Sequence, residues 1–279
     1  PETTLKKMLD ELNCIKDSRT KECYQTVIQR IKVSTERDYF FKQELINGLK
    51  KRGFDLKKLV LCDHHYAHAM TAWFPSPFSD GLIFCADGRG DGRSMSLWKA
   101  KRGHKLQLLD FCSELVSPGA FYGFITYILG FEPDRHEGKV TGLSAQGKMT
   151  DAYRILKELY FFDTNQKKIV ANYSKGFSPF IRGKNLVLSK KLKKFSNKDI
   201  AYAVQKVLEE NIIDFLKFNI KKFNFKKINI CMAGGVIGNV KLNYEINKIK
   251  NVSNIYIFPS MGDGGIAAGG AFNALEDKF

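Results

Sequence analysis

Several features that would mark other classes of protein are missing from this chain. No apolar stretch approaches the roughly 20 residues that a membrane-spanning helix needs, and the Pro-Glu-Thr-Thr start has neither the basic segment nor the apolar segment of a signal peptide. The six cysteines form no Cys-x-x-Cys pair, and four of them lie in strand-like runs, where a free thiol behaves as a small buried hydrophobe. No internal repeat or low-complexity tract stands out. We expect a cytoplasmic, globular protein with no membrane partner.

Composition and charge narrow the class of ligand. A length of 279 residues, 44% hydrophobic and 13% aromatic, is enough for one large or two modest domains with real cores. The net charge of +16 favours anionic partners such as nucleotides, phosphates or nucleic acid. Lysines occur throughout the chain, however, so most of this charge is interpreted as solvated surface. We expect a nucleotide or phosphate ligand and no nucleic-acid partner.

Two histidines one helical turn apart are the most informative residues. His64 and His68 lie in Asp63-His64-His65-Tyr66-Ala67-His68, and side chains at i and i+4 share one face of an α-helix. Two imidazoles at this spacing can bind one metal ion, although such a pair, taken alone, is more often an ordinary pair of solvated or buried histidines. His65 lies off that face and is interpreted as a support for the metal ligands or as a structural residue. Asp63 is predicted to cap the helix, after a short strand at 59–62.

Two aspartates flanked by glycines strengthen the metal hypothesis. Asp87 follows the apolar run 81–86, and Asp263 follows the run 255–258. Both runs are typical of buried strands, and loops at strand ends are where α/β scaffolds hold their ligands. We therefore predict that the two histidines and the two aspartates form one metal site beside a phosphate-binding cleft.

The segment 87–92 reads Asp-Gly-Arg-Gly-Asp-Gly. Its glycines Gly88 and Gly90 would let backbone N–H groups converge on a phosphate. A plain hairpin is the alternative, because Asp-Gly is a strong turn signal by itself. Both interpretations are compatible, since in either one the glycine-rich turn joins two strands, 81–86 and 94–98.

A second glycine element follows the predicted strand 228–233. Gly234 and Gly235, then Asn239, form a strand–Gly-Gly–helix pattern that allows a nucleotide to approach the backbone at a helix N-terminus. A Gly-Gly pair after a strand is more often only a tight turn. The loop around Asp263 and Gly264 has the same architecture with a carboxylate added.

The remaining segments complete an alternation of helices and strands. A third strand is predicted at 106–109, and residues 163–198 are predicted to form an irregular surface excursion. Helices are predicted over 3–50, over 121–129, after a capping box formed by Ser196 and Asp199, and over 266–275.

The ligand types narrow the identity of the metal. Two neutral imidazoles and two carboxylates form a mixed nitrogen and oxygen set that suits Fe²⁺, Mn²⁺ or Zn²⁺ and is poor for Ca²⁺. Because such binding needs unprotonated imidazole, we expect it to weaken below about pH 6.

Taken in order, these elements resemble the O-carbamoyltransferases of the nodulation-protein and antibiotic-tailoring (cephamycin) type. The matching segments are spread over some 200 residues in the family's order, which makes them far more specific together than singly. They are 63–69, 86–91, 117–122 with Thr126 and 129–131, 137–147, 233–239 and 260–270.

The resemblance implies an α/β protein with the actin-like ATPase fold (ASKHA, RNase H-like), in which two domains with mixed sheets face a nucleotide cleft. Residues 1–80 would be a partial first subdomain that carries the histidine helix, and the helix 264–279 would pack back on it. Residues 81–263 would be the second subdomain, with the phosphate and adenosine loops.

The resemblance also implies the chemistry, which is transfer of a carbamoyl group from carbamoyl-adenylate, formed from carbamoyl phosphate and ATP, to a hydroxyl of a small acceptor such as a sugar or secondary metabolite. His64, His68, Asp87 and Asp263 would then hold the catalytic metal, with Fe²⁺ expected first. The other expected binding residues are Gly88, Gly90 and Gly264 near phosphate, Gly234, Gly235 and Asn239 on the adenosine side, and Lys139 in the segment Gly-Lys-Val-Thr-Gly.

Family members begin with a β-hairpin that carries the first phosphate loop, and they end with a YrdC-like domain that makes the carbamoyl-adenylate. Pro1 falls just after that hairpin and Phe279 lies where the first domain ends. We therefore expect the transfer domain without its leading strands, with the YrdC-like domain supplied by the full-length chain or by a partner.

Two alternatives stay open. A tRNA threonylcarbamoyl transferase would agree with the basic charge, but that family's metal helix usually reads His-x-Glu-Gly-His, whereas this helix reads His-His-Tyr-Ala-His. A nucleotide- and metal-binding fragment that is inactive without further segments is the other alternative. The sequence does not identify the acceptor. We expect the residues that select it to lie in the segment 163–198.

Overall fold

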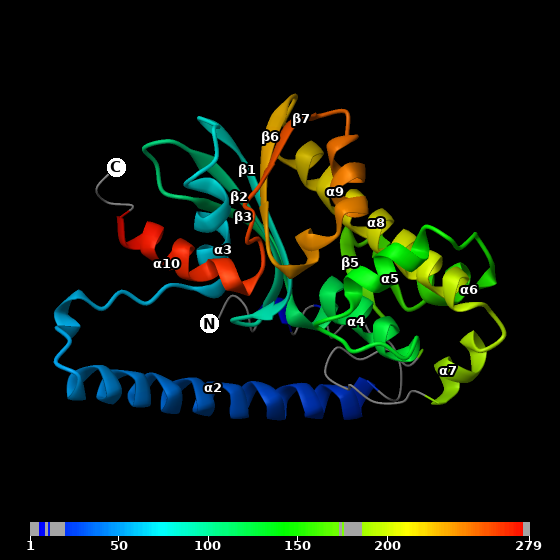
Figure 1. Ribbon diagram of the computed structural model, residues 1–279, viewed down its shortest axis with the longest axis horizontal. Coiled ribbons are helices and arrows are strands. Elements are labelled where there is room, and N and C mark those ends of the chain that lie inside the picture. The colour runs from blue at the N-terminus through cyan, green and yellow to red at the C-terminus, as the bar shows by residue number, and fades with distance from the viewer. Residues whose placement is uncertain (1–5, 9–10, 12–19, 173–174, 176–185, 276–279) are drawn as a thin grey trace.

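The protein, described here from a computed structural model over residues 6–8, 11, 20–172, 175 and 186–275, is built around a five-stranded mixed sheet (Figure 1). The strand order is β3-β2-β1-β6-β7. Strands β1 (Asp80–Gly90), β2 (Arg93–Lys101) and β3 (Gln107–Ser113) pair antiparallel, and β6 (Ile228–Ala233) and β7 (Val252–Ile257) run parallel to β1. The predicted α/β class with a mixed sheet is therefore confirmed.

Helices cover both faces of this sheet, so the central strand β1 contributes to two cores. Leu82 and Phe84 enter the larger core, against α4 (Pro118–Ile128), α8 (Asn197–Lys222) and α9 (Val240–Asn247). Ile83 and Cys85 point to the other face and pack against α3 (His64–Trp73). Burial on both sides explains why β1 is a continuous apolar run instead of an alternating one.

The last described helix, α10 (Ile266–Leu275), packs on α3 (Figure 1). The two helices approach closely because Gly269 has no side chain, and a Cβ there would overlap the carbonyl oxygen of Ala67. Phe74 and Phe272 stack with ring centroids 4.4 Å apart. This contact brings the Asp263 loop to the histidine helix. The division at residue 80 remains a proposal, and α3 itself packs directly on the sheet of the second predicted subdomain.

Two local predictions around the site need correction. The predicted strand at 59–62 is not formed, and Leu59, Val60 and Leu61 are exposed. An apolar run becomes a strand only beside a partner strand, which the described part of the chain does not place there. Strand β1 also continues through the predicted glycine-rich turn as far as Gly90. The turn is confined to Asp91 and Gly92, whose φ angles of 49° and 76° are those of an Asp-Gly hairpin.

The predicted irregular excursion at 163–198 is wrong in part. It contains β5 (Lys168–Ala171), which pairs antiparallel with β4 (Tyr160–Asp163), and α7 (Leu186–Leu192). Leu188 and Leu192 of α7 are buried at i, i+4 spacing, so a short apolar stripe forms this helix within a basic sequence. Residues 173–174 and 176–185 lie outside the described residues.

The predicted helices are formed where the structure describes them. Helix α2 (Thr20–Lys51) runs along one side of the molecule (Figure 1), and residues 3–5, 9–10 and 12–19 of the prediction over 3–50 lie outside the described part. Ser196 caps α8 by accepting a hydrogen bond from the Asp199 backbone N–H at 3.1 Å. Helices α5 (Glu137–Ser144) and α6 (Asp151–Lys157) join α4 to β4. Among the described residues, none of the helices is both long and apolar enough to cross a membrane.

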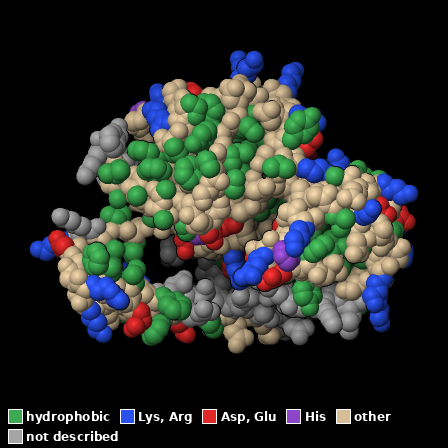
Figure 2. All heavy atoms as spheres, in the orientation of Figure 1, with side chains coloured by type: hydrophobic (Ala, Val, Ile, Leu, Met, Phe, Trp, Pro, Cys, Tyr) green, Lys and Arg blue, Asp and Glu red, His purple; other side chains and the backbone are tan. Residues whose placement is uncertain are grey.

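Lys and Arg side chains lie at several separate places on the face shown in Figure 2. That distribution agrees with the interpretation of most of the net charge as solvated surface.

Candidate metal centre and adjoining cavity

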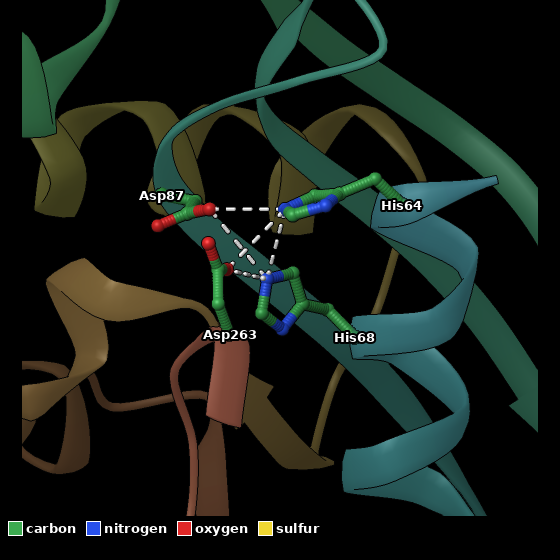
Figure 3. A group of neighbouring side chains, drawn as sticks. All are labelled: His64, His68, Asp87 and Asp263. Carbon is green, nitrogen blue, oxygen red and sulfur yellow. Dashed lines mark hydrogen bonds and ion pairs between the residues drawn. The ribbon is translucent and has the colours of Figure 1, made fainter. Parts of the chain in front are cut away.

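Four side chains from three separate parts of the chain converge at one point (Figure 3). The Nε2 atoms of His64 and His68 lie 3.1 Å apart. His64 Nε2 is 3.1 Å from Asp87 Oδ2, and His68 Nε2 is 3.2 Å from Asp263 Oδ1. One ligand atom from each residue lies within 4.8 Å of all the others. The structure thus brings together the four residues that the sequence analysis grouped.

The cluster is closed on one side and open on the other. The His68 side chain is 0% exposed and that of Asp87 is 11% exposed, whereas that of Asp263 is 66% exposed. The site therefore has a buried wall formed by α3 and β1, and a face toward solvent at the Asp263 loop.

The donor set fits a divalent metal ion. Ligand atoms at about 2.0–2.2 Å from an ion lie roughly 3–3.5 Å from their neighbours, and the closest approaches within the cluster are 3.1 to 3.5 Å. Two carboxylates offset two positive charges, and neutral imidazole nitrogen is a common partner to them.

The first turn of α3 is fixed by the hairpin beside it. Asp63 caps the helix as predicted, because its Oδ1 accepts a hydrogen bond from the Tyr66 backbone N–H at 3.0 Å. Asp91, in the β1–β2 turn, accepts a hydrogen bond from the His64 backbone N–H at 2.7 Å. His65 is not among the clustered ligands, and its Nδ1 lies 3.0 Å from Ser96 Oγ, which agrees with its position off the metal-binding face.

The electrostatics of the cluster follow from burial and charge. The hydrogen bond with Asp87 raises the pKa of His64 above its usual value, against the opposing effect of burial. Burial alone would raise the pKa of Asp87, but hydrogen bonds with His64 and His68 hold this pKa well below its usual range. Burial, with repulsion from the neighbouring imidazoles, lowers the pKa of His65 to about 3.

Two glycines around Asp87 have different surroundings. A Cβ on Gly90 would overlap the ring of His64, whereas a Cβ on Gly88 would meet nothing within 4 Å. Gly90, predicted as a phosphate-loop residue, therefore leaves room for the His64 ring. Gly88 lines an open cavity.

A cavity of about 640 Å³ adjoins the cluster. Asp87 and Asp263 lie at its wall together with Gly88, Gly235 and Asn239. Most of the remainder is formed by α4 and α5, which contribute Gly119, Ala120, Tyr122, Gly123, Phe124, Tyr127, Glu137, Gly138 and Thr141. A mostly apolar pocket of this size with a few polar groups is typical of a small-molecule site.

The other predicted binding residues lie at or near this cavity. Gly234, with a φ of 100°, makes the tight turn after β6, where a Cβ would overlap the carbonyl of Ala86. Lys139 is exposed on α5, next to the lining residue Gly138, and Gly264 is exposed next to Asp263.

None of the lining residues of α4 and α5 was predicted individually as a site residue. Tyr122, Gly138 and Thr141 lie within the segments 117–122 and 137–147 that carry the family resemblance. That resemblance was the available signal, because a glycine or aromatic residue on a helix does not by itself indicate a cavity.

Comparison with known proteins shows which proteins this chain is similar to. It matches the family model "Carbamoyltransferase N-terminus" over residues 15–272. It is 33% identical over 231 residues to an uncharacterized protein of Methanocaldococcus jannaschii, covering 77% of this chain and 37% of that protein. It is 25% identical over 272 residues to the nodulation protein NolNO of Sinorhizobium fredii, covering 94% of this chain and 39% of that protein.

The crystal structure of full-length HypF in its phosphate- and nucleotide-bound form is similar in fold, with a TM-score of 0.53 at 13% identity, over 78% of this chain and 43% of HypF. This likeness confirms the predicted actin-like ATPase fold class. The chain spans less than half the length of these relatives. The family match covers nearly all of the sequence, and the chain therefore belongs to the carbamoyltransferase N-terminal family.

Proposed function

We propose that this chain is the transfer domain of a metal-dependent O-carbamoyltransferase. Its cavity would hold ATP or the carbamoyl-adenylate formed from carbamoyl phosphate and ATP, and its acceptor would be the hydroxyl of a small molecule, such as a sugar or secondary metabolite. The observation that carries the proposal is the continuity between cluster and cavity, since Asp87 and Asp263 belong to both.

Two comparisons support this assignment. The family is named for carbamoyl transfer, and a nodulation protein is among the relatives. HypF, which shares the fold, was crystallised with phosphate and nucleotide. On the proposed arrangement Gly234, Gly235 and Asn239 face the adenosine, and Gly88 and Gly264 lie near phosphate. Lys139 would lie at the edge of the nucleotide.

The four clustered side chains, His64, His68, Asp87 and Asp263, would hold the divalent ion, for which Fe²⁺ is the first candidate, followed by Mn²⁺ and Zn²⁺. A bound ion would supply Lewis-acid chemistry at a phosphate or carbonyl oxygen. Backbone N–H groups of the glycine loops would donate hydrogen bonds to the negative charge that develops on that oxygen during transfer.

The transfer itself converts a mixed carbamic–phosphoric anhydride into a carbamate ester. The oxygen of the acceptor hydroxyl bonds to the carbamoyl carbon, the bond between that carbon and the phosphate oxygen breaks, and AMP leaves with the electron pair. The hydroxyl proton passes to a base at the acceptor. The cavity wall of α4 and α5 would exclude water, which otherwise competes with the acceptor for the carbamoyl group.

The proposal is tested with two assays. Isothermal titration calorimetry, carried out under argon with the Fe²⁺-loaded chain, should show that ATP binds at one site. With the YrdC-like domain present, in the full-length chain or added, radiolabelled carbamoyl phosphate and ATP should carbamoylate members of a panel of sugars. Absence of ATP binding would contradict the assignment of the cavity. Binding without transfer to any hydroxyl would favour a nucleotide- and metal-binding fragment, and salt-sensitive tRNA binding would favour the threonylcarbamoyl alternative.

A further inference from the structure

Four polar residues, one from each of four helical elements, meet at the cavity wall. The residues are Tyr122 of α4, Thr141 of α5, Gln205 of α8 and Asn239, the N-cap of α9. We call this group the polar junction. Tyr122, Thr141 and Asn239 line the cavity, whereas Gln205 is 1% exposed and lies behind them.

Gln205 and Asn239 form a reciprocal amide pair. Gln205 Nε2 donates to Asn239 Oδ1 at 3.0 Å, and Asn239 Nδ2 donates to Gln205 Oε1 at 2.8 Å. Gln205 Oε1 also accepts from the Tyr122 hydroxyl at 2.9 Å. Gln205 Nε2 also donates to Glu209 Oε1 at 2.8 Å. The amide of Gln205 thus makes all four hydrogen bonds of which it is capable.

The side-chain amide of Asn239 likewise makes all four hydrogen bonds of which it is capable. Besides its pair with Gln205, its Oδ1 accepts from the Leu242 backbone N–H at 3.1 Å, and its Nδ2 donates to Thr141 Oγ1 at 3.4 Å. Its polar atoms therefore hold α9 and α5 in place, and a ligand could bond to them only by displacing one of these partners.

Glu209 determines which way round the side-chain amide of Gln205 lies. The Glu209 side chain, one turn after Gln205 on α8, is 7% exposed, and its Oε1 accepts from Gln205 Nε2 at 2.8 Å. It therefore requires the NH₂ group of Gln205 to face it, which turns the Gln205 carbonyl toward Tyr122 and Asn239.

We propose that Gln205 is a positioning residue for the nucleotide half of the cavity, an inference that rests on the proposed function. It joins α8 to α4 and α9 at one buried point, and Thr141 of α5 is bonded in turn to Tyr122 and Asn239. Gln205 thereby fixes the width of the cavity between the Gly235–Asn239 loop and α4 before the nucleotide arrives. Buried networks whose members are all satisfied specify one arrangement, and a preformed site avoids the cost of ordering its walls on binding.

Three substitutions separate positioning from general stability. Gln205→Leu removes all four bonds. Gln205→Glu keeps the two acceptor positions but loses both donors, and it places a carboxylate against Glu209. Glu209→Gln is the matched control, because its amide oxygen still accepts from Gln205. Each variant is measured for ATP affinity by calorimetry, for metal per chain and for melting temperature.

We expect both Gln205 variants to weaken ATP binding by roughly tenfold or more, with bound metal unchanged, and Glu209→Gln to stay within about twofold of the parent. Folded Gln205 variants that bind ATP like the parent, or that lose ATP and metal together, would overturn the proposal.

A second measurement needs neither variants nor nucleotide. The side-chain amide protons of Gln205 and Asn239 should be protected from exchange in NMR spectra of the nucleotide-free protein. Rapid exchange would show that the junction is not preformed and would contradict the proposal. If the parent protein binds no ATP, the proposed function fails, and this spectrum still decides whether the junction exists.

Discussion

Asp87 and Gly235 are joined by a 3.0 Å hydrogen bond from the Gly235 backbone N–H to Asp87 Oδ1, while Asp87 Oδ2 faces His64 Nε2 at 3.1 Å. One carboxylate therefore connects the glycine loop of the cavity with the imidazoles of the metal cluster. Its two oxygens serve different parts of the site, which makes them separable by substitution.

Asp87→Asn should reduce metal affinity at least tenfold while leaving the fold nearly as stable, because the amide oxygen can still accept from Gly235 but the anionic ligand is gone. Asp87→Ala should lose metal and also about 1–2 kcal/mol of stability, since the Gly235 N–H loses its hydrogen-bond partner. Metal titration and urea denaturation measure the two effects. Equal stability losses in both variants would contradict the separate roles.

His64→Ala and Asp263→Ala should each abolish stoichiometric metal binding while leaving the far-ultraviolet circular dichroism spectrum unchanged. Each removes one of four converging ligands, and Asp263 is too exposed to contribute much to packing. His104→Ala, at an exposed position away from the cluster, is the control and should keep its metal. Elemental analysis of the purified variants is the measurement, and unchanged metal content in either ligand variant would refute the assignment.

Gly90→Ala should weaken metal binding strongly, whereas Gly88→Ala should spare it. A Cβ on Gly90 overlaps the His64 ring, and the ring must move out of the ligand position. A Cβ on Gly88 meets nothing within 4 Å, and Gly88 lines the cavity. ATP affinity is therefore the property that we expect Gly88→Ala to change. The opposite pattern in metal and ATP titrations would show that Gly90 acts as a phosphate-loop glycine.

Asp91→Ala should lower the free energy of unfolding by about 1–2 kcal/mol, because the His64 backbone N–H at the start of α3 loses its acceptor. Asp91→Asn should lose much less, since the amide oxygen still accepts and Asn tolerates the left-handed φ of 49° at this position. Chemical denaturation of the metal-free protein checks both. A full loss in the Asn variant would mean that the negative charge, and not the hydrogen bond, stabilises the helix.

Metal affinity should fall as the pH decreases through the raised pKa of His64, by about tenfold per pH unit below it for the one proton displaced. Because Asp87 bonds to the protonated ring, this pKa lies above the usual 6.5 in the metal-free protein. The same shift stabilises the metal-free fold below pH 6.5, and that contribution is lost as pH rises through the folded-state pKa. Between pH 6.5 and the raised pKa of His64, stability should thus fall with pH in the metal-free protein and rise with pH in the metal-bound protein, and thermal melts with and without chelator over this range test the difference. Parallel pH profiles would contradict it.

Local signals predicted the parts of the structure that local interactions determine. The i, i+4 histidines, the Asp63 cap and the Ser196 half of the predicted capping box each depend on one or two turns of helix, and all three are formed. The apolar run of β1 was readable for the same reason, because burial on both faces leaves a continuous pattern.

The features that escaped prediction depend on residues far away in sequence. Leu59–Leu61 has strand-like residues but no strand beside it in the described structure. The role of Gly90 depends on the ring of His64, which reaches it from another element. Gln205 occurs in the middle of a helical apolar stripe, and only the fold shows that residues from two other elements bond to it.

The most direct test of the account is anomalous X-ray scattering from crystals of the Fe²⁺-loaded protein, recorded on both sides of the iron absorption edge. The account predicts one peak per chain, between the Nε2 atoms of His64 and His68 and the carboxylates of Asp87 and Asp263. A peak elsewhere, or an ordered protein with the four side chains in place and no peak between them, would contradict it.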